Sequence, residues 1–114
     1  MNQYNLESRT FEFSKNLIDT IRTIKVSLYS ESIIKQLIRS GTSVGANYRE
    51  ANGAESKKDF KHKISISLKE ARETKYWLEL LLVSNPESHE KLNPLQKEIY
   101  ELTLIFGKIN SSCK

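Results

Sequence analysis

The chain has 114 residues, with 18 Lys and Arg against 14 Asp and Glu, and it contains only two Pro, four Gly, two His and one Cys. This length predicts one domain, residues 1–114, and so few turn residues argue against a β-sandwich or a small barrel. A lone Cys cannot form an internal disulfide, and no apolar run approaches the roughly 20 residues of a membrane span. We therefore expect a helical, cytoplasmic protein that binds no membrane, metal or cofactor.

The first apolar repeat predicts a helix over residues 7–28. Its members recur every three or four residues, as one helical face requires: Phe13, Leu17, Ile21, Ile24 and Leu28. Ser30 follows as a candidate N-cap for the next helix, because a Ser hydroxyl can accept a hydrogen bond from an amide of the first turn.

A second helix is predicted over residues 31–53. Its apolar phase continues across Gly41 and Gly45, although each glycine in a helix interior costs about 1 kcal/mol relative to Ala. That cost indicates the close approach of a neighbouring backbone. The alternative is a helix break at residues 40–43.

Two further helices are predicted over residues 57–84 and 94–110. Ser56 and Asp59 resemble a capping box at the start of the third helix, which should end before Pro86. Asn93 is the candidate N-cap of the fourth helix, with Pro94 at its first position. Because the connections are short, the predicted fold is all-α, an antiparallel up-down-up-down four-helix bundle.

Residues suited to catalysis are scarce. His62 and His89 fall in different segments, and no nucleophile or orienting carboxylate is spaced to lie beside either of them. A metal site fails on ligand number, because Glu70 and Glu73 have no accompanying histidine. Our interpretation is that the protein is not an enzyme. The enzyme hypothesis would require a perturbed titratable pair, for which Glu70 and Glu73 are the only candidates.

The excess positive charge lies in one segment. Residues 57–75 contain seven basic and three acidic residues, whereas the other 95 residues contain eleven of each. At about 100° per residue, the outward side of the third helix combines these charges with an aromatic ring: Lys58, Lys61, His62, Ser65, Lys69, Arg72 and Tyr76. Such a basic stripe can follow a phosphate backbone, and it predicts nucleic-acid binding. The alternative is a solvated face that maintains solubility.

A flank of the third helix, about 100° from its core stripe, interleaves apolar residues with carboxylates: Ile66, Glu70, Glu73 and Trp77. The second helix has a small polar face opposite its apolar residues: Ser40, Ser43, Asn47 and Glu50. Small polar faces permit close helix approach, and Trp is enriched at the centres of interfaces. These faces therefore predict a contact between subunits, unless Trp77 only covers the rim of its own bundle.

Three segments together resemble a known family: SVGANYREA at 43–51, SKKDF at 56–60 and KEARETKYWL at 69–78. Their order and spacing are similar to those of the small four-helix bundle proteins encoded in intervening sequences of the bacterial 23S ribosomal RNA gene. These proteins are related to the accessory variability proteins of diversity-generating retroelements. The resemblance extends over nearly the whole chain. It implies a ring-like homo-oligomer, expected to be a homopentamer, with no known enzymatic activity.

By this resemblance, the matched polar residues shape the bundle and its subunit contacts: Ser43, Asn47, Glu50, Glu70, Glu73 and Trp77. The basic residues would form the nucleic-acid surface: Lys58, Lys61, Lys69 and Arg72. The retroelement relatives bind a reverse transcriptase and nucleic acid. We therefore expect RNA or DNA binding through the basic stripe. The alternative is an adaptor that scaffolds a protein partner, such as a reverse transcriptase or another mobile-element enzyme.

Overall fold

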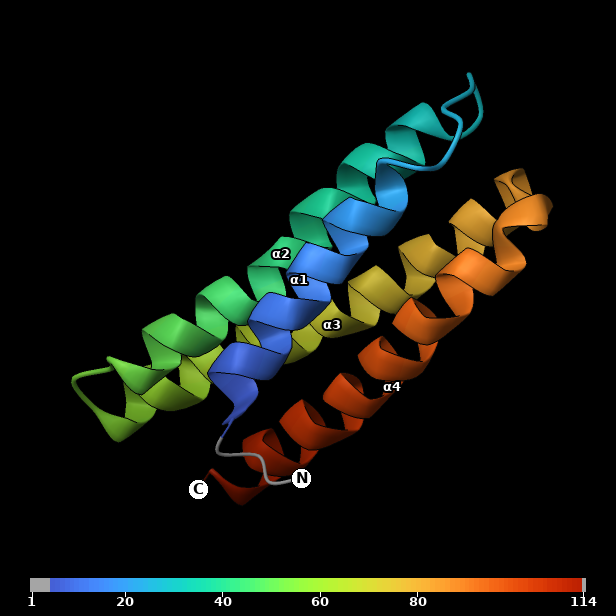
Figure 1. The fold of residues 1–114 in the computed structure, drawn as a ribbon. Coiled ribbons are helices and arrows are strands. Elements are labelled where there is room, and N and C mark those ends of the chain that lie inside the picture. Colours follow the sequence, from blue (N-terminus) through green and yellow to red (C-terminus); the bar gives the residue numbers. More distant parts are fainter. Residues whose placement is uncertain (1–4, 114) are drawn as a thin grey trace.

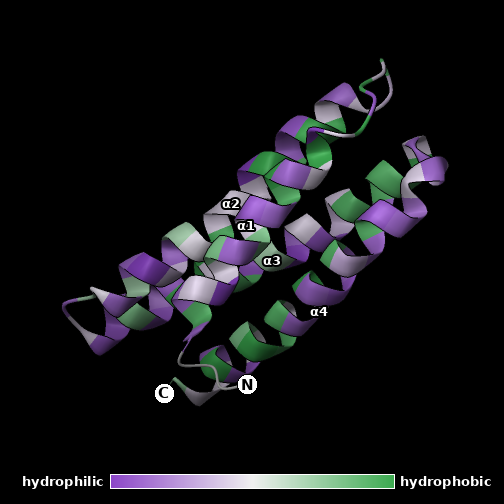
Figure 2. Ribbon diagram, viewed as in Figure 1, coloured by the Kyte–Doolittle hydropathy of each residue, from purple (hydrophilic) through white to green (hydrophobic). Residues whose placement is uncertain are grey.

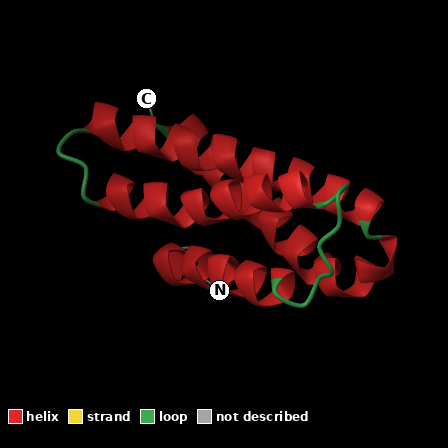
Figure 3. Ribbon diagram, turned by 90° about the horizontal axis from the view of Figure 1, so that it is seen from above, coloured by secondary structure: helices red, strands yellow, loops and turns green. Residues whose placement is uncertain are grey.

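The computed structural model describes residues 5–113, and the regular structure in this range is helical throughout. Helix α1 spans Leu6–Ile21, α2 spans Glu31–Asn52, α3 spans Lys57–Ser84 and α4 spans His89–Ser112, with a short 3-10 turn, η2, at Pro86–Ser88. Consecutive helices run in opposite directions and pack in sequence order (Figure 1). The loops lie at the ends of the helices (Figure 3). The all-α prediction with four sequentially packed helices is confirmed.

Every helix turns an apolar side inward. Hydrophobic and hydrophilic residues alternate along each ribbon (Figure 2), as expected for amphipathic helices that share one core. Burial of each large apolar side chain contributes roughly 1.5–3 kcal/mol relative to exposure. All four helices supply fully buried side chains: Phe13, Leu17, Leu37, Val44, Ile64, Leu78, Leu81, Ile99, Leu102 and Phe106.

The second and third helices form as the sequence predicts. Helix α2 continues without a break through Gly41 and Gly45. Glycine is needed at both positions because α1 packs closely against them. A Cβ at Gly45 would lie 2.9 Å from Thr10 Oγ1, and one at Gly41 would clash with the buried Leu17 side chain. At the start of α3, Ser56 Oγ accepts a hydrogen bond from the Asp59 amide at 3.0 Å, which is the N-cap bond of the predicted capping box.

The first helix is shorter than predicted. It ends at Ile21 rather than at residue 28, and the chain then continues through bonds that join amides to carbonyls three residues back. Thr23 Oγ1 also donates to the Thr20 carbonyl at 2.7 Å, and such a side-chain bond competes with helix continuation. Ile24 is still buried in the loop, whereas Leu28 is 86% exposed. The prediction that Leu28 belongs to the core stripe was wrong.

Ser30 precedes α2 but does not cap it through its side chain. Its hydroxyl accepts a hydrogen bond from the Ser27 amide at 2.8 Å, which orders the preceding turn instead of the helix. The position of the predicted N-cap is therefore confirmed, and its predicted hydrogen bond is wrong.

The fourth helix begins at His89, five residues before the predicted start, so the prediction of Asn93 as its N-cap was wrong. Pro94 is the sixth residue of the helix, just beyond the four positions whose amides have no acceptor, so it removes the one hydrogen bond that an amide there would donate to the Glu90 carbonyl. Leu92, in the turn before it, is fully buried. Burial of this side chain keeps the turn helical despite the proline.

Helix packing is uneven around the molecule. The α2–α3 contact is the most extensive, whereas α1 and α4 meet sparsely and leave between them a hollow of about 930 Å³. Arg9 crosses this hollow to Glu98, with Nε–Oε2 and Nη2–Oε1 distances of 2.6 and 2.9 Å. The hydrogen bond to Glu98 raises the pKa of Arg9, so the guanidinium stays charged.

Candidate nucleic-acid interface

The predicted basic stripe lies on the exposed side of α3, and among its seven residues Ser65 is half-buried. We call the other six the α3 basic stripe, and their side chains are all exposed: Lys58, Lys61, His62, Lys69, Arg72 and Tyr76. The opposite side of the same helix is buried, with Ile64 and Ala71 both at 0% exposure. Since 14 residues separate Lys58 from Arg72, the cations extend over about 21 Å at ~1.5 Å per residue.

The cations of the stripe lack partners of their own. Among residues 5–113, none of Lys58, Lys61, Lys69 and Arg72 takes part in an ion pair. Five other cations of this range do: Arg9, Lys15, Lys35, Arg39 and Lys63. The remaining cations of residues 5–113, such as Arg22 and Lys25, are also without an ion pair but are spread over other parts of the chain. The unpaired charges of α3 are therefore concentrated on its outward side, where an anionic ligand can reach them.

Each end of the stripe has a distinct feature. At the start of α3, a hollow of about 510 Å³ is lined by Lys57, Lys58, Phe60, Lys61, Ser112 and Cys113. At the other end, Tyr76 is 53% exposed and its ring meets that of Trp77 edge to face, with centroids 5.0 Å apart. The stripe thus runs from a lysine-lined hollow to an exposed aromatic ring.

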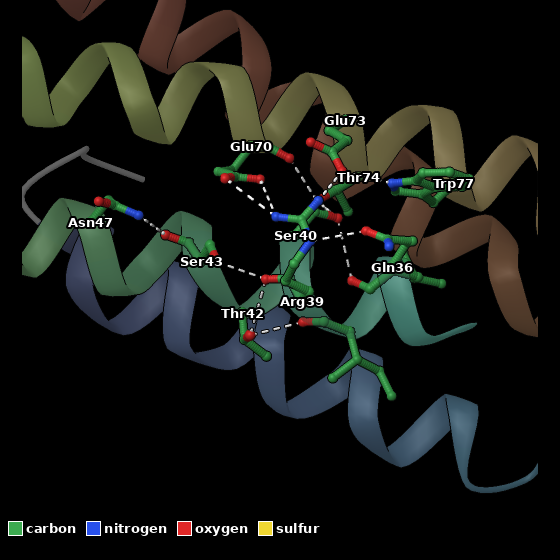
Figure 4. A network of polar contacts seen from close by, with 12 residues as sticks. Gln36, Arg39, Ser40, Thr42, Ser43, Asn47, Glu70, Glu73, Thr74 and Trp77 are labelled. Carbon is green, nitrogen blue, oxygen red and sulfur yellow. Dashed lines mark hydrogen bonds and ion pairs between the residues drawn. The ribbon is translucent and has the colours of Figure 1, made fainter. Parts of the chain in front are cut away.

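The flank of α3 beside the stripe faces α2 and is held by Arg39 (Figure 4). The Arg39 guanidinium forms an ion pair with Glu70, at 3.2 Å from Nη1 to Oε1, and another with Glu73 through Nη2. Glu73 Oε2 also accepts a hydrogen bond from Trp77 Nε1 at 2.9 Å, and Gln36 Oε1 accepts one from Arg39 Nε at 2.9 Å. We call these five residues the Arg39 network.

The remaining residues predicted to form a subunit contact also have partners inside the chain. Ser43 Oγ donates to the Arg39 carbonyl at 2.7 Å, and Asn47 Nδ2 donates to the Ser43 carbonyl at 2.9 Å. Glu50 accepts from Lys63 Nζ at 2.7 Å, a hydrogen bond that raises the pKa of Lys63. Ile66 is half-buried. Of these contacts, the one between Lys63 and Glu50 crosses the α2–α3 seam, whereas those of Ser43 and Asn47 stay within α2, and the subunit contact itself stays a prediction.

Ser40 differs from its predicted position on an exposed polar face. It is fully buried, and its hydroxyl is hydrogen-bonded at 2.9 Å to the equally buried hydroxyl of Thr74. Burial of a hydroxyl is costly unless it is paired, and the pairing of these two hydroxyls satisfies that condition. The α2–α3 seam therefore contains both the fully buried Ser40–Thr74 hydroxyl pair and the partly exposed Arg39 network.

Sequence reasoning missed Arg39 and the covering of Tyr100 by a cation. Arg39 lies one turn before Ser43 on the polar face of α2, so the helical spacing contained the signal, but its partners depend on the register between α2 and α3. Lys75 Nζ lies 6.0 Å from the centre of the Tyr100 ring of α4. Lys75 belongs to the basic segment of residues 57–75, yet its side chain lies over a ring of α4 and not along the stripe.

The features that would suggest other chemistry are sparse. His62 and His89 are both exposed. Among residues 5–113, no three His, Cys, Asp or Glu side chains are grouped so that they could hold a metal ion. The helices in this range are all too short or too polar to cross a bilayer.

Comparison with known proteins identifies relatives by sequence and by fold. The model of the 23S rRNA-intervening sequence protein family matches residues 3–108. Among solved structures, the chain is similar to a protein of unknown function from the S23 ribosomal protein family of Bacteroides thetaiotaomicron. The two are 34% identical, the match covers 93% of this chain and 98% of the other, and the TM-score is 0.80. No curated protein matches the chain.

Proposed function

The chain belongs to the 23S rRNA-intervening sequence protein family, and from this premise we propose that it is a non-enzymatic homo-oligomer that binds the phosphate backbone of RNA or DNA. The α3 basic stripe is the proposed binding surface. The supporting observation is the clustering of unpaired cations, because the four cations of the stripe all lie on one exposed side of α3 and none of them has an ion-pair partner in residues 5–113. Exposed, unpaired cations can displace the counterions of a phosphate backbone on binding.

Assembly into an oligomer would multiply this surface. Each copy adds one stripe, so several weak phosphate contacts would act at a high effective concentration. We propose that the outer surface along the α2–α3 seam contacts the neighbouring subunit, and that Trp77 and Ile66 are the apolar residues of this contact. Because Arg39 already neutralises carboxylates of this face within the chain, covering it would bury few unpaired charges. A ring of five copies is the arrangement that the family resemblance implies.

The nucleic-acid proposal is tested by removing charge from the stripe. We expect Lys69→Gln with Arg72→Gln to weaken the binding of a fluorescein-labelled RNA or DNA oligonucleotide, as measured by anisotropy over a salt series. The logarithm of the binding constant falls as the logarithm of the salt concentration rises. The loss of two phosphate contacts should make this dependence less steep, by roughly 1.4 on single strands and 1.8 on duplexes. The matched control is Arg22→Gln with Lys25→Gln, which removes two exposed cations from the loop between α1 and α2.

The result that contradicts the proposal is an equal salt slope for the two double variants and the unchanged protein. Binding that is absent even at low salt also contradicts it. Either result would favour the adaptor function, in which the chain scaffolds a protein partner and the stripe only maintains solubility.

A further inference from the structure

Tyr76 differs from the other exposed aromatic residues on the helices. Arg49 lies 5.8 Å from the centre of the Phe11 ring, and Lys75 lies 6.0 Å from that of Tyr100, so a cation of the chain already covers each of these rings. The described contact of the Tyr76 ring is the edge-to-face one with Trp77. Such a contact occupies at most one of the two faces of the tyrosine ring. Tyr76 is 53% exposed, so a face remains open to a ligand.

The Tyr76 ring also has a firm support. Its neighbour Trp77 packs against the hydrophobic core and donates its indole N–H to Glu73 at 2.9 Å. Glu73 is in turn paired with Arg39 of α2. The Arg39 network therefore holds the indole on which the Tyr76 ring rests. A ring that is fixed before binding loses less conformational freedom on binding, which favours affinity.

The ring lies where a bound backbone would pass. Arg72 precedes Tyr76 by one helical turn and Lys69 precedes it by two turns, all on the same exposed side of α3. Seven residues correspond to about 10 Å along the helix axis. A strand whose phosphates contact Lys69 and Arg72 would bring its next bases to Tyr76.

We propose that Tyr76 is a stacking platform for an unpaired base, so that the α3 basic stripe selects single-stranded nucleic acid over duplexes. This inference rests on the proposed function. Base faces in a duplex are covered by neighbouring base pairs, whereas a single strand can turn a base outward onto an aromatic side chain. Phosphate contacts alone would not select the single strand, because a duplex presents the higher density of phosphate charge.

The test compares three fluorescein-labelled DNA ligands of equal length: a mixed-sequence strand without self-complementarity, its duplex, and a strand of the same backbone in which the sites are abasic. We expect Tyr76→Ala to weaken single-strand binding about tenfold or more and to leave duplex and abasic binding within about twofold. Tyr76→Phe retains the ring and should bind the single strand almost as the unchanged protein does.

The chain has one Trp, which gives an independent readout. Because Trp77 touches Tyr76, stacking of a base should quench the Trp77 fluorescence when the single strand binds, but not when the abasic strand binds. The quenching should be lost in Tyr76→Ala.

Two results separate this inference from the proposed function. If Tyr76→Ala changes single-strand and duplex binding equally or not at all, while Lys69→Gln with Arg72→Gln weakens both, the stacking platform is overturned and backbone binding stands. If the unchanged protein binds none of the three ligands at low salt, both proposals are overturned.

Discussion

The outward stripe of α3 and the flank that faces α2 are both rich in charge, yet their charges find partners in different places. On the flank, Arg39 pairs with Glu70 and Glu73 within the chain. On the stripe, none of the four cations has a partner in residues 5–113. The comparison teaches that the pairing of charges, more than their number, separates a surface that stabilises the fold from one that remains open to a ligand.

The largest expected effect on the free energy of unfolding is that of removing the Trp77 side chain from the flank. Trp77→Ala should destabilise the chain by about 2 kcal/mol, less than the roughly 3–5 kcal/mol of a fully buried aromatic, because the side chain is half-buried. Urea unfolding measures this change. If the flank is the subunit contact, light scattering should also show a lower oligomer mass with helical content retained.

The neighbouring residue supplies the control for that experiment. Tyr76→Ala should change the free energy of unfolding by no more than about 0.5 kcal/mol, because its side chain is half exposed and lies outside the core. An unchanged mass in Trp77→Ala would show that the flank is not the subunit contact, and complete unfolding would assign Trp77 to the core.

The next effect is that of removing the cation of the flank. Arg39→Ala should cost about 1 kcal/mol, since solvent screens the half-exposed ion pairs and the two carboxylates one turn apart then repel each other. A double-mutant cycle with Glu73→Gln, followed by urea unfolding, measures the coupling. Arg22→Ala, at an exposed loop residue, is the control and should have almost no effect. A coupling of zero would show that the network contributes nothing to stability.

A smaller effect of opposite sign is expected on the stripe. Lys69→Gln with Arg72→Gln removes two like charges that have no partner in the described chain, so the free energy of unfolding should stay equal or rise by up to about 0.5 kcal/mol. Thermal unfolding at low salt is the measurement. A clear loss of stability would mean that the stripe supports the fold, and the comparison between the two faces would fail.

The smallest effect should appear only in alkaline solution. The hydrogen bond to Glu50 raises the pKa of Lys63 above its ordinary value, so the charged form of Lys63 stabilises the folded state. This contribution is complete below the unfolded-state pKa and is lost as pH rises through the folded-state pKa. The melting temperature of Lys63→Met should therefore fall less than that of the unchanged protein as pH rises through this range. Lys61→Met, at an unpaired position, should follow the unchanged protein.

The helix pattern and one cap could be predicted from the sequence because they depend on local spacing. The third helix forms over Lys57–Ser84 as predicted, and Ser56 caps it. The end of α1 could not be predicted in this way, because Leu28 continues the apolar phase although the backbone has already turned at Thr23. The start of α4 was predicted too late, because Asn93 and Pro94 resemble the beginning of a helix. Burial of Leu92 outweighs this weak local signal, and the helix begins at His89.

Exposure of the stripe could also be predicted, since the side of a single helix that points away from its core follows from angle alone. The contacts of the flank could not be predicted. Whether Glu73 is paired depends on the register of α2 against α3, which places Arg39 opposite it. The spacing on one helix contains no information about that register.

The order in which the helices pack has a consequence for folding. Each helix contacts mainly the helix next to it in sequence, and the distant α1–α4 contact is sparse. Chains with such local contacts fold fast, because little loop-closure entropy is lost before packing begins. The α2–α3 pair has the most extensive contact and is joined only by residues 53–56, so we expect it to form the folding nucleus. The surface proposed to bind nucleic acid would then exist before α1 and α4 complete the core.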